Sequence, residues 1–474
     1  MNRQQTLIRP ELSVERFLPR KKPKGAWERS ALCERFSSKL AVRNNLSRRL
    51  ISYQGNKDQP GLRWFKYKEG FSAELVREAL CYADGPVLDP FAGIGTTALV
   101  AGGSDRPATG IEIMPVGSRV ARAISCIANN VNLDTVKEHA SHLQKSIQSK
   151  RNASEHRFRH VPITEKAFPP ETEDEISKAR AYLAEIEDET VRLILDVACM
   201  SILEKVSFTR KDGQYLRWDE RCGRELRGGM NKGPIPSFAE ALNSRVCEIL
   251  HDSPSLISQF RGIKPKIIEG SSLKELPRLA DNSIGLTITS PPYANRYDYT
   301  RTYALELSWL GYDREAFSKL RQELISATVE NRPKDQLLDR HYPHPDMLAK
   351  ARVAIASQGA LAEVLGALES HRDELSNPQV IRLVANYFSE MALVIAELAR
   401  VTKPGGKVIM VNDNVQYNGE EVPVDLILSD IAEQFGFECE EISVLPRGKG
   451  NASQQMGKFG RRELRKCVYR WHMK

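Results

Sequence analysis

The strongest constraint on the fold is the segment PVLDPFAGIGTTALVA (86–101). It has the pattern of a short apolar strand, a turn that contains glycines, and the start of a helix. A second apolar strand, ATGIEI (108–113), follows, and Val120, Ile124 and Ile127 then recur at helical spacing. A strand, a helix and a strand in this order form a βαβ unit, which predicts a parallel sheet.

Two long interruptions divide the sheet pattern, the first after this unit and the second among the later strands. After the first, apolar strands are predicted at KIIEG (266–270) and SIGLTIT (283–289). After the second, which shows no sustained period, an amphipathic helix leads into the strand KVIMVN (407–412), and two more strands follow. The predicted parts are an irregular, basic N-terminal extension (1–62), the first half of a sheet domain (63–134), a largely helical insertion (135–262), and the second half of the sheet domain (263–474) with a second insertion at about 312–378.

Composition excludes several other classes of protein. The chain has 474 residues, and its 41% hydrophobic and 27% charged residues are ordinary values for globular proteins rather than for disordered ones. A membrane span needs about 18 consecutive apolar residues, and no stretch of the sequence approaches that length. The N-terminus lacks the apolar region of a secretory signal. We therefore expect a cytoplasmic protein without a membrane partner.

The cysteines do not indicate a metal site. The sequence contains eight of them, with no two at C-x-x-C spacing and no nearby histidine that would complete a zinc pattern. Reduced, mostly buried thiols are the simpler interpretation, and we expect no bound metal.

The charge distribution is uneven. Residues 1–70 carry a net charge of +11 and residues 447–474 a net charge of +8, so the centre must carry −11 for the chain to reach its total of +8. Basic ends of this kind fit contact with a polyanion such as a nucleic acid. Solvated, flexible termini explain the same charges equally well.

The turn DPFAGIGTT (89–97) is expected at the carboxyl edge of the sheet. Gly93 and Gly95 permit a tight turn and a close approach of a ligand to the backbone, and the following helix N-terminus favours a negative group. Glu112 ends the second strand, where its carboxylate can accept hydrogen bonds from ribose hydroxyls. A nucleotide-type cofactor is the natural ligand. A single Gly-x-Gly is a weak signal by itself, and an ordinary solvated carboxylate remains the alternative for Glu112.

The segment TSPPY (289–293) also follows an apolar strand and is therefore expected at the same edge. Its prolines stiffen the loop and leave carbonyl groups without competing N–H donors. Ser290 offers a hydroxyl acceptor, and Tyr293 offers a flat face for stacking. This set suits a planar base with an exocyclic amino group. A simple proline turn at the end of a strand is the alternative.

Together, DPFAGIGTT and TSPPY resemble the S-adenosylmethionine-dependent amino-methyltransferases of DNA. The Ser-Pro-Pro-Tyr form is more similar to the cytosine-N4 branch than to the adenine-N6 branch, whose motif usually begins with Asp or Asn. The segment RWFKYKEGFSAELV (63–76) resembles the additional cofactor motif of this family. The resemblance covers about residues 63–133 and 266–474.

The resemblance implies an α/β fold, the Rossmann-like seven-stranded methyltransferase sheet with an antiparallel last strand. It implies S-adenosylmethionine as the cofactor, bound by the 63–134 half, and catalysis by the 263–474 half. The methyl group would pass directly to cytosine N4, and the base would leave the duplex to reach the pocket. The implied cofactor-binding residues are Phe71, Asp89, Phe91, Ala92, Gly93, Gly95, Thr96, Thr97, Glu112 and Ser271, and the implied catalytic residues are Ser290, Pro291, Pro292 and Tyr293.

The sequence departs from the family pattern at two points. The third strand usually ends in an acidic residue that contacts the adenine amino group, but EGSS (269–272) offers only Ser271 or Ser272 there. In addition, the cofactor motif precedes the catalytic motif and a long insertion separates them, which is unusual for the Ser-Pro-Pro-Tyr branch. Target recognition is therefore expected from 135–262, from 312–378 or from the basic N-terminus.

The basic loop RGKGNASQQMGKFGRREL (447–464) is expected to join the last two strands and to overhang the pocket. Its cations Arg447, Lys449, Arg461 and Arg462 fit contact with DNA phosphates, and a flexible basic hairpin is the alternative. The expected partner is double-stranded DNA, and a cognate restriction enzyme is a further partner to consider. Three rival functions stay open: an adenine-N6 DNA methyltransferase, an RNA-base amino-methyltransferase, and a DNA-binding protein with a vestigial site.

Overall fold

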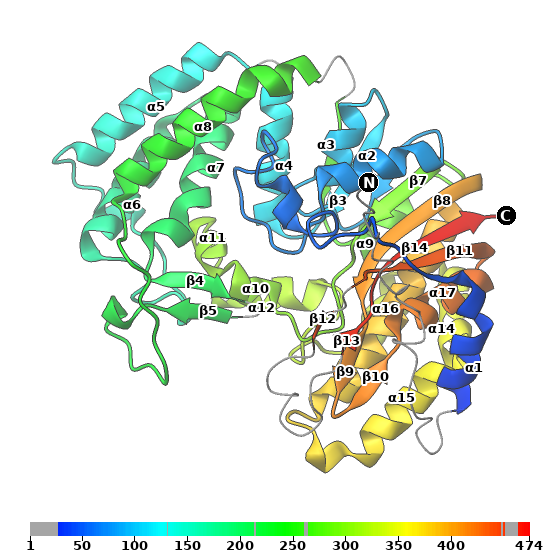
Figure 1. Ribbon diagram of the computed structural model, residues 1–474. Coiled ribbons are helices and arrows are strands. Elements are labelled where there is room, and N and C mark those ends of the chain that lie inside the picture. Colours follow the sequence, from blue (N-terminus) through cyan, green and yellow to red (C-terminus); the bar gives the residue numbers. More distant parts are fainter. Residues whose placement is uncertain (1–26, 130, 213–214, 260–263, 447–448, 451–462) are drawn as a thin grey trace, which may run out of the picture.

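The computed structural model describes residues 27–474 except 130, 213–214, 260–263, 447–448 and 451–462. Its centre is an eight-stranded sheet with the strand order β1-β11-β14-β8-β7-β2-β3-β6 (Figure 1). The strands are β1 (Leu40–Val42), β2 (Val87–Asp89), β3 (Ala108–Glu112), β6 (Lys266–Glu269), β7 (Ile284–Thr289), β8 (Thr402–Asp413), β11 (Phe437–Val444) and β14 (Lys466–Met473).

The strand directions confirm the predicted α/β fold of the Rossmann-like methyltransferase type. β14 runs antiparallel to both of its neighbours, and the other pairs in the sheet are parallel. The sheet has one strand more than predicted, because β1 from the N-terminal extension pairs with β11. Three residues are too few to show a recognisable alternation, so this edge strand has no signal in the sequence.

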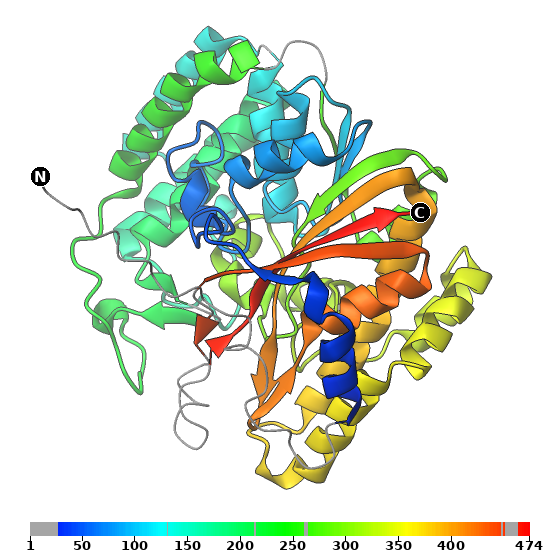
Figure 2. The same cartoon turned by 45° about the vertical axis from the view of Figure 1, so that its right-hand side comes forward.

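Helices cover both faces of the sheet (Figures 1 and 2). As parallel sheets require, β7 is buried along its whole length. The residues at helical spacing in the sequence, such as Val120 and Phe388, form the buried faces of α4 and α16. One face carries α2 (Ala73–Ala79), α3 (Thr96–Gly102) and α4 (Pro115–Ala128), and the other carries α9 (Ser272–Glu275), α16 (Gln379–Val401) and α17 (Val424–Gln434).

The segment after α4 forms a helical lobe beside the sheet, in cyan and green in Figure 1. Its core is continuous with that of α4, since side chains from α4, α7 and α8 belong to one buried cluster. A short hairpin interrupts the helices. The elements are α5 (Leu133–Gln148), α6 (Pro170–Glu185), α7 (Glu189–Val206), β4 (Thr209–Asp212), β5 (Tyr215–Trp218) and α8 (Phe238–Gln259).

Two regions predicted to lack regular structure contain helices. In the N-terminal extension, α1 (Trp27–Arg35) packs against α15 and α17. The buried faces of α14 and α15 consist largely of alanine and leucine, which gives a weaker periodic signal than larger side chains do. The second insertion and the segment before it form α10 (Tyr299–Thr302), α11 (Ala304–Trp309), α12 (Arg314–Glu323), α13 (Asp335–His341), α14 (Pro345–Ala356) and α15 (Gly359–Ser370).

Among the described residues, α16 has the length and composition of a membrane-crossing helix, and the bent pair α14–α15 would match as one span. The apolar window of α16 is 67% buried, and Val384, Phe388 and Met391 lie against the sheet in a core cluster. α16 therefore has the burial of a core helix. The eight cysteines are free thiols, and most of them are buried.

Candidate active site

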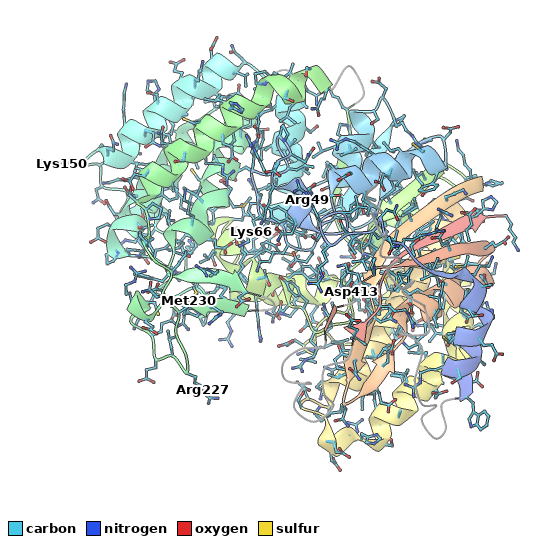
Figure 3. The ribbon with its side chains drawn as sticks, viewed as in Figure 1. Arg49, Lys66, Lys150, Arg227, Met230 and Asp413 are labelled. Atoms are coloured by element: carbon cyan, nitrogen blue, oxygen red, sulfur yellow. The ribbon has the colours of Figure 1, made fainter. Side chains whose placement is uncertain are left out.

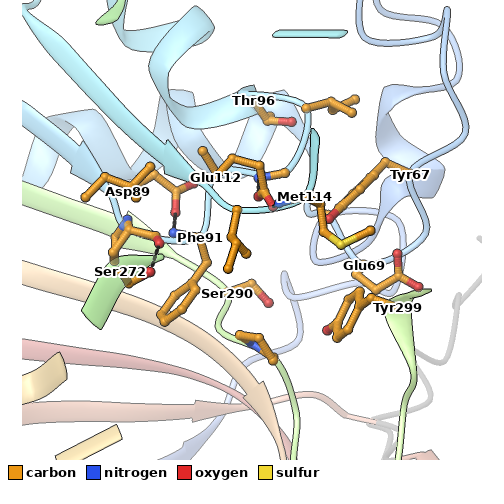
Figure 4. Close-up of a pocket in the computed structure, with 18 of the residues that line it drawn as sticks. Tyr67, Glu69, Asp89, Phe91, Thr96, Glu112, Met114, Ser272, Ser290 and Tyr299 are labelled. Carbon is orange, nitrogen blue, oxygen red and sulfur yellow. Dashed lines mark hydrogen bonds between the residues drawn. The ribbon is translucent and has the colours of Figure 1, made fainter. Parts of the chain in front are cut away.

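A pocket lies beyond the carboxyl ends of β2, β3 and β7 (Figure 4). The predicted site residues that line it are Phe71, Asp89, Phe91, Ala92, Gly93, Thr96, Glu112, Ser290 and Pro292. The predicted residues that do not line it, although each neighbours a lining residue in the chain, are Gly95, Thr97, Ser271, Pro291 and Tyr293. The structure thus brings the two sequence motifs to one pocket.

The turn has no room for a Cβ atom at either of its two glycines. Gly93 and Gly95 have φ angles of +55° and +81°, in the left-handed region that favours glycine. A Cβ atom on Gly93 would stand 2.8 Å from Cε1 of Tyr67, and one on Gly95 would stand 2.8 Å from Cβ of Ala121. The turn is therefore packed between the Tyr67 ring and α4, and its backbone forms part of the pocket wall.

Glu112 holds the turn by both of its carboxylate oxygens. Oε2 accepts a hydrogen bond from the backbone N–H of Gly93, and Oε1 accepts one from the N–H of Met114 at 2.6 Å. Burial raises the pKa of Glu112 to about 8, although both hydrogen bonds act to lower it. Each oxygen keeps a second lone pair, so the carboxylate can still accept hydrogen bonds from a ligand.

Asp89 connects the two motifs. Its Oδ1 accepts hydrogen bonds from Thr289 Oγ1 at 2.7 Å and from the N–H of Phe91 at 3.0 Å. Burial raises the pKa of Asp89 to about 6. Thr97 acts in the same way from α3, because its hydroxyl donates to the carbonyl of Ile288 at 3.1 Å. These bonds fix the glycine turn relative to the end of β7.

The two serines after β6 differ in their placement. Ser271, the serine predicted to bind the cofactor, donates its hydroxyl hydrogen to the carbonyl of Glu323 at 3.2 Å. Ser272 lines the pocket instead, and its hydroxyl donates to the carbonyl of Pro90 in the glycine turn. From the sequence alone, either serine could have stood in place of the acidic residue at the end of the third strand.

Sequence reasoning missed an aromatic wall with one carboxylate. Tyr67, Glu69 and Tyr299 line the pocket (Figure 4). The Tyr67 ring stacks on that of Tyr303, with centroids 5.1 Å apart, and the Tyr303 hydroxyl donates to Glu69 Oε2 at 2.7 Å. A signal was present, because YANRYDYTRTY (293–303) contains four tyrosines. A carboxylate among aromatic rings suits a cationic ligand group.

The Ser-Pro-Pro-Tyr loop places one hydroxyl at the pocket. Ser290 is partly exposed there, and its Oγ lies 3.1 Å from the phenol oxygen of Tyr293, with which it shares a hydrogen bond. Burial raises the pKa of Tyr293. The hairpin β9 (Val415–Tyr417) and β10 (Glu420–Val422) supports the loop, because the Tyr417 hydroxyl donates to the carbonyl of Ala294.

A partly buried ion pair beside this loop was also missed. Lys466 and Asp413 come from neighbouring strands, and their charged atoms lie 3.3 Å apart. Burial alone would lower the pKa of Lys466, but Tyr293 and Asp413 outweigh it, so the pKa is raised. Nothing local in the sequence links Lys466 to the motif at 289–293.

The predicted DNA-binding residues are only partly within the described chain. Arg447, Arg461 and Arg462 lie outside the described residues. Lys449 belongs to β12 (Lys449–Gly450), which pairs with β13 (Glu463–Leu464) in an antiparallel ladder.

The sheet order, the antiparallel β14 and the pocket at the carboxyl edge define a Rossmann-like protein of the methyltransferase type. No family model matches the chain. Over 458 residues the chain is 41% identical to the Type II methyltransferase M.AvaI of Nostoc sp. (strain PCC 7120). The matched region covers 93% of this chain and 92% of the relative.

Two further curated relatives agree. M.AvaI of Anabaena variabilis gives the same values, and the Type II methyltransferase M.BsoBI of Geobacillus stearothermophilus is 37% identical over 457 residues, 90% of this chain and 88% of the relative. The chain therefore belongs to the Type II methyltransferases, which are site-specific DNA methyltransferases.

Proposed function

We propose that this protein transfers a methyl group from S-adenosylmethionine to the exocyclic N4 amino group of cytosine in double-stranded DNA. The observation that carries the proposal is that Ser290 of the Ser-Pro-Pro-Tyr loop lines the same pocket as Gly93 and Glu112. This arrangement supports a binding site for an amino group next to one for a nucleoside cofactor. The membership of the chain in the Type II methyltransferases supports DNA as the substrate.

The residues that line the pocket suit the polar and charged groups of S-adenosylmethionine. Glu112 would accept hydrogen bonds from the ribose hydroxyls, and the backbone of the Gly93 turn, which packs against the Tyr67 ring without a Cβ atom, would lie beside the ligand. Phe71 would lie beside the methionine part, and Glu69 would face its cationic end. When bound, the cofactor supplies a methyl group activated by a sulfonium.

Ser290 is proposed to orient the target amino group. Its hydroxyl and the carbonyl of Pro291 would accept the two N–H bonds of that group and point the nitrogen lone pair at the methyl carbon. The nitrogen gains positive charge as the new C–N bond forms and the C–S bond breaks, so both hydrogen bonds strengthen in the transition state. The electron pair of the broken C–S bond stays on the sulfur of the leaving thioether, and the nitrogen then releases one proton to water. No covalent bond to the protein forms, so no cysteine is needed.

The base specificity is tested by incubating the protein with DNA and labelled S-adenosylmethionine and then analysing the nucleosides. We expect the label in 4-methylcytosine. Label in 6-methyladenine alone would overturn the base assignment, and label that enters RNA but not DNA would overturn the substrate. Cofactor binding without transfer to any nucleic acid would favour a vestigial site.

We also propose that the basic loop contacts DNA phosphates and that the helical insertion 135–262 contributes to target recognition. The loop proposal rests on the cations in the sequence. Replacement of Arg461 and Arg462 by Ala should weaken DNA binding and reduce its salt slope by about two, because each lost phosphate contact lowers the slope by roughly one. Cofactor binding should not change. If the DNA affinity and the salt slope are unaltered, the loop only connects the last two strands and does not contact DNA phosphates.

The cellular setting follows from the family. We propose that the protein acts in the cytoplasm, where it protects DNA from a restriction enzyme of the same specificity. DNA treated with the protein and S-adenosylmethionine should then resist a nuclease that cleaves at the methylated sequence. Full cleavage of DNA shown to be methylated would argue against a protective role toward that nuclease.

A further inference from the structure

A partly buried lysine stands at the same sheet edge as the Ser-Pro-Pro-Tyr loop. Lys466 is the first residue of β14, and the antiparallel register pairs it with Asp413, the last residue of β8. Its Nζ lies 3.3 Å from Asp413 Oδ1, and the two side chains are 18% and 5% exposed. Figure 3 labels Asp413 near the middle of the molecule, where these strands converge.

The lysine reaches the catalytic loop through a tyrosine ring. Nζ of Lys466 lies over the Tyr293 ring, 5.6 Å from its centroid. A cation in this position is attracted by the negative face of the ring. The phenol oxygen of the same ring shares a hydrogen bond with Ser290 Oγ at 3.1 Å. A continuous chain of contacts therefore runs from Asp413 through Lys466 and Tyr293 to Ser290.

The neighbour of Lys466 holds the start of the strand in place. Successive strand residues point to opposite faces. On the other face, Arg465 forms a buried two-point ion pair with Asp425 of α17, with a distance of 2.9 Å between Nη2 and Oδ1. The N–H of Asn414 donates to the carbonyl of Arg465 at 2.9 Å. The backbone at the start of β14 is therefore held in place, and the ion pair with Asp413 holds the Lys466 side chain itself.

We propose that Lys466 is a positioning residue for the Ser-Pro-Pro-Tyr loop: it covers one face of Tyr293 and fixes the ring angle at which the phenol reaches Ser290. The inference rests on the proposed function, in which Ser290 binds the amino group and Tyr293 stacks on the base. It assigns the target base to the face of the ring opposite Lys466.

An ordinary structural ion pair is the rival explanation, and the sheet contains a matched example. Lys407 of β8 pairs with Glu440 of β11 at 2.7 Å, with side chains 21% and 25% exposed. Lys407 is similar to Lys466 in burial and in partner type, but it lies midway along β8, six residues before Asp413. If Lys466 only stabilises the sheet, replacing either lysine should have the same consequences.

The test compares Lys466→Met, Lys466→Arg and the control Lys407→Met in the full chain. Methionine keeps the length of the side chain and removes the charge, whereas arginine keeps a cation that can lie over an aromatic ring. For Lys466→Met we expect kcat to fall roughly tenfold with an unchanged KM for the cofactor. Lys466→Arg should recover most of the rate. Lys407→Met should retain wild-type kcat, and thermal unfolding should show whether the two Met variants lose similar stability.

A second measurement reports on the ring directly. A DNA duplex with 2-aminopurine at the target position changes its emission when the base leaves the stack and meets an aromatic ring. Lys466→Met should alter the emission of the bound complex, while Lys407→Met should match the wild type. Wild-type kcat in Lys466→Met, an equal loss in Lys407→Met, or no recovery in Lys466→Arg would each overturn the positioning role. Wild-type protein that methylates no nucleic acid in the same assay would overturn the proposed function itself, and the inference with it.

Discussion

The glycine turn after β2 and the Ser-Pro-Pro-Tyr loop after β7 lie side by side, but they are held in different ways. The turn is held partly by a group close to it in the sequence, since Gly93 and Met114 both donate to Glu112, and partly by β7, through Thr289 on Asp89. The loop is supported by groups more than a hundred residues away, namely Lys466 over Tyr293 and Tyr417 on Ala294. Within the described part of the chain, only the second of these segments, the loop after β7, is also supported by residues from the last strands and the β9–β10 hairpin.

The largest expected effect is on the catalytic half alone. Ser290→Ala should lower kcat by about 10²–10³, the scale of losing one hydrogen bond that is strongest in the transition state. Cofactor affinity should stay nearly unchanged, because the Gly93 turn and Glu112 are intact. Steady-state methylation and calorimetry with the cofactor measure the two quantities separately.

The matched control is Ser283→Ala. Ser283 directly precedes β7 at the opposite end of the strand from Ser290, and its hydroxyl only donates to the carbonyl of Ala280 at 2.6 Å. This variant should keep wild-type turnover. Wild-type turnover in Ser290→Ala as well would remove the serine from the proposed mechanism.

The next effect is on the cofactor half alone. In Gly93→Val, the new side chain meets the Tyr67 ring, since a Cβ atom at that position would stand 2.8 Å from Cε1. We expect cofactor binding to weaken by up to about 10²-fold. A loss of this size corresponds to the free-energy cost of overpacking a site, which is about 1–3 kcal/mol. Calorimetry measures this loss on protein shown to be folded.

Backbone strain needs its own control in that experiment, because valine at positive φ costs about 1–2 kcal/mol wherever it occurs. Gly223 has a φ of +68°, and a Cβ atom there would meet nothing within 4 Å. Gly223→Val should therefore lose only the stability that the backbone strain costs and keep wild-type cofactor affinity. Equal affinities in the two variants would show that the Gly93 turn does not contact the cofactor.

The same contrast explains how much the sequence could predict. The βαβ unit and the tight turn at Gly93 and Gly95 follow from local patterns in the sequence. The methyltransferase sheet with its antiparallel last strand and most of the individual site residues came from the resemblance to a known family. The pairing of β1 with β11, the aromatic wall of Tyr67 and Tyr303, and the lysine over Tyr293 depend on contacts between distant segments. No periodicity or spacing encodes such contacts, and the choice between Ser271 and Ser272 depended on the start of a single short helix.

The smallest expected effect is a pH dependence confined to the cofactor half. Burial raises the pKa of Glu112 from 4.5 to about 8, so at pH 7 the cofactor-free protein holds this carboxyl mostly protonated. Folding stability should therefore fall as the pH rises from about 4.5 to about 8, because the unfolded carboxyl has already ionised. Cofactor binding should respond in the opposite direction, since ribose hydroxyls donate to the ionised form.

Binding at pH 7 should thus release a proton from Glu112, and affinity should increase by up to about tenfold between pH 7 and pH 9. The amino group of the cofactor itself titrates in the same pH range, because an α-amino group has a pKa of about 8. The contribution of Glu112 is therefore the difference between the wild type and Glu112→Gln, measured by calorimetry in buffers of different ionisation enthalpy. The Gln variant should bind more weakly at every pH and release fewer protons. Equal proton release in both proteins would mean that the buried carboxylate does not accept the ribose hydroxyls.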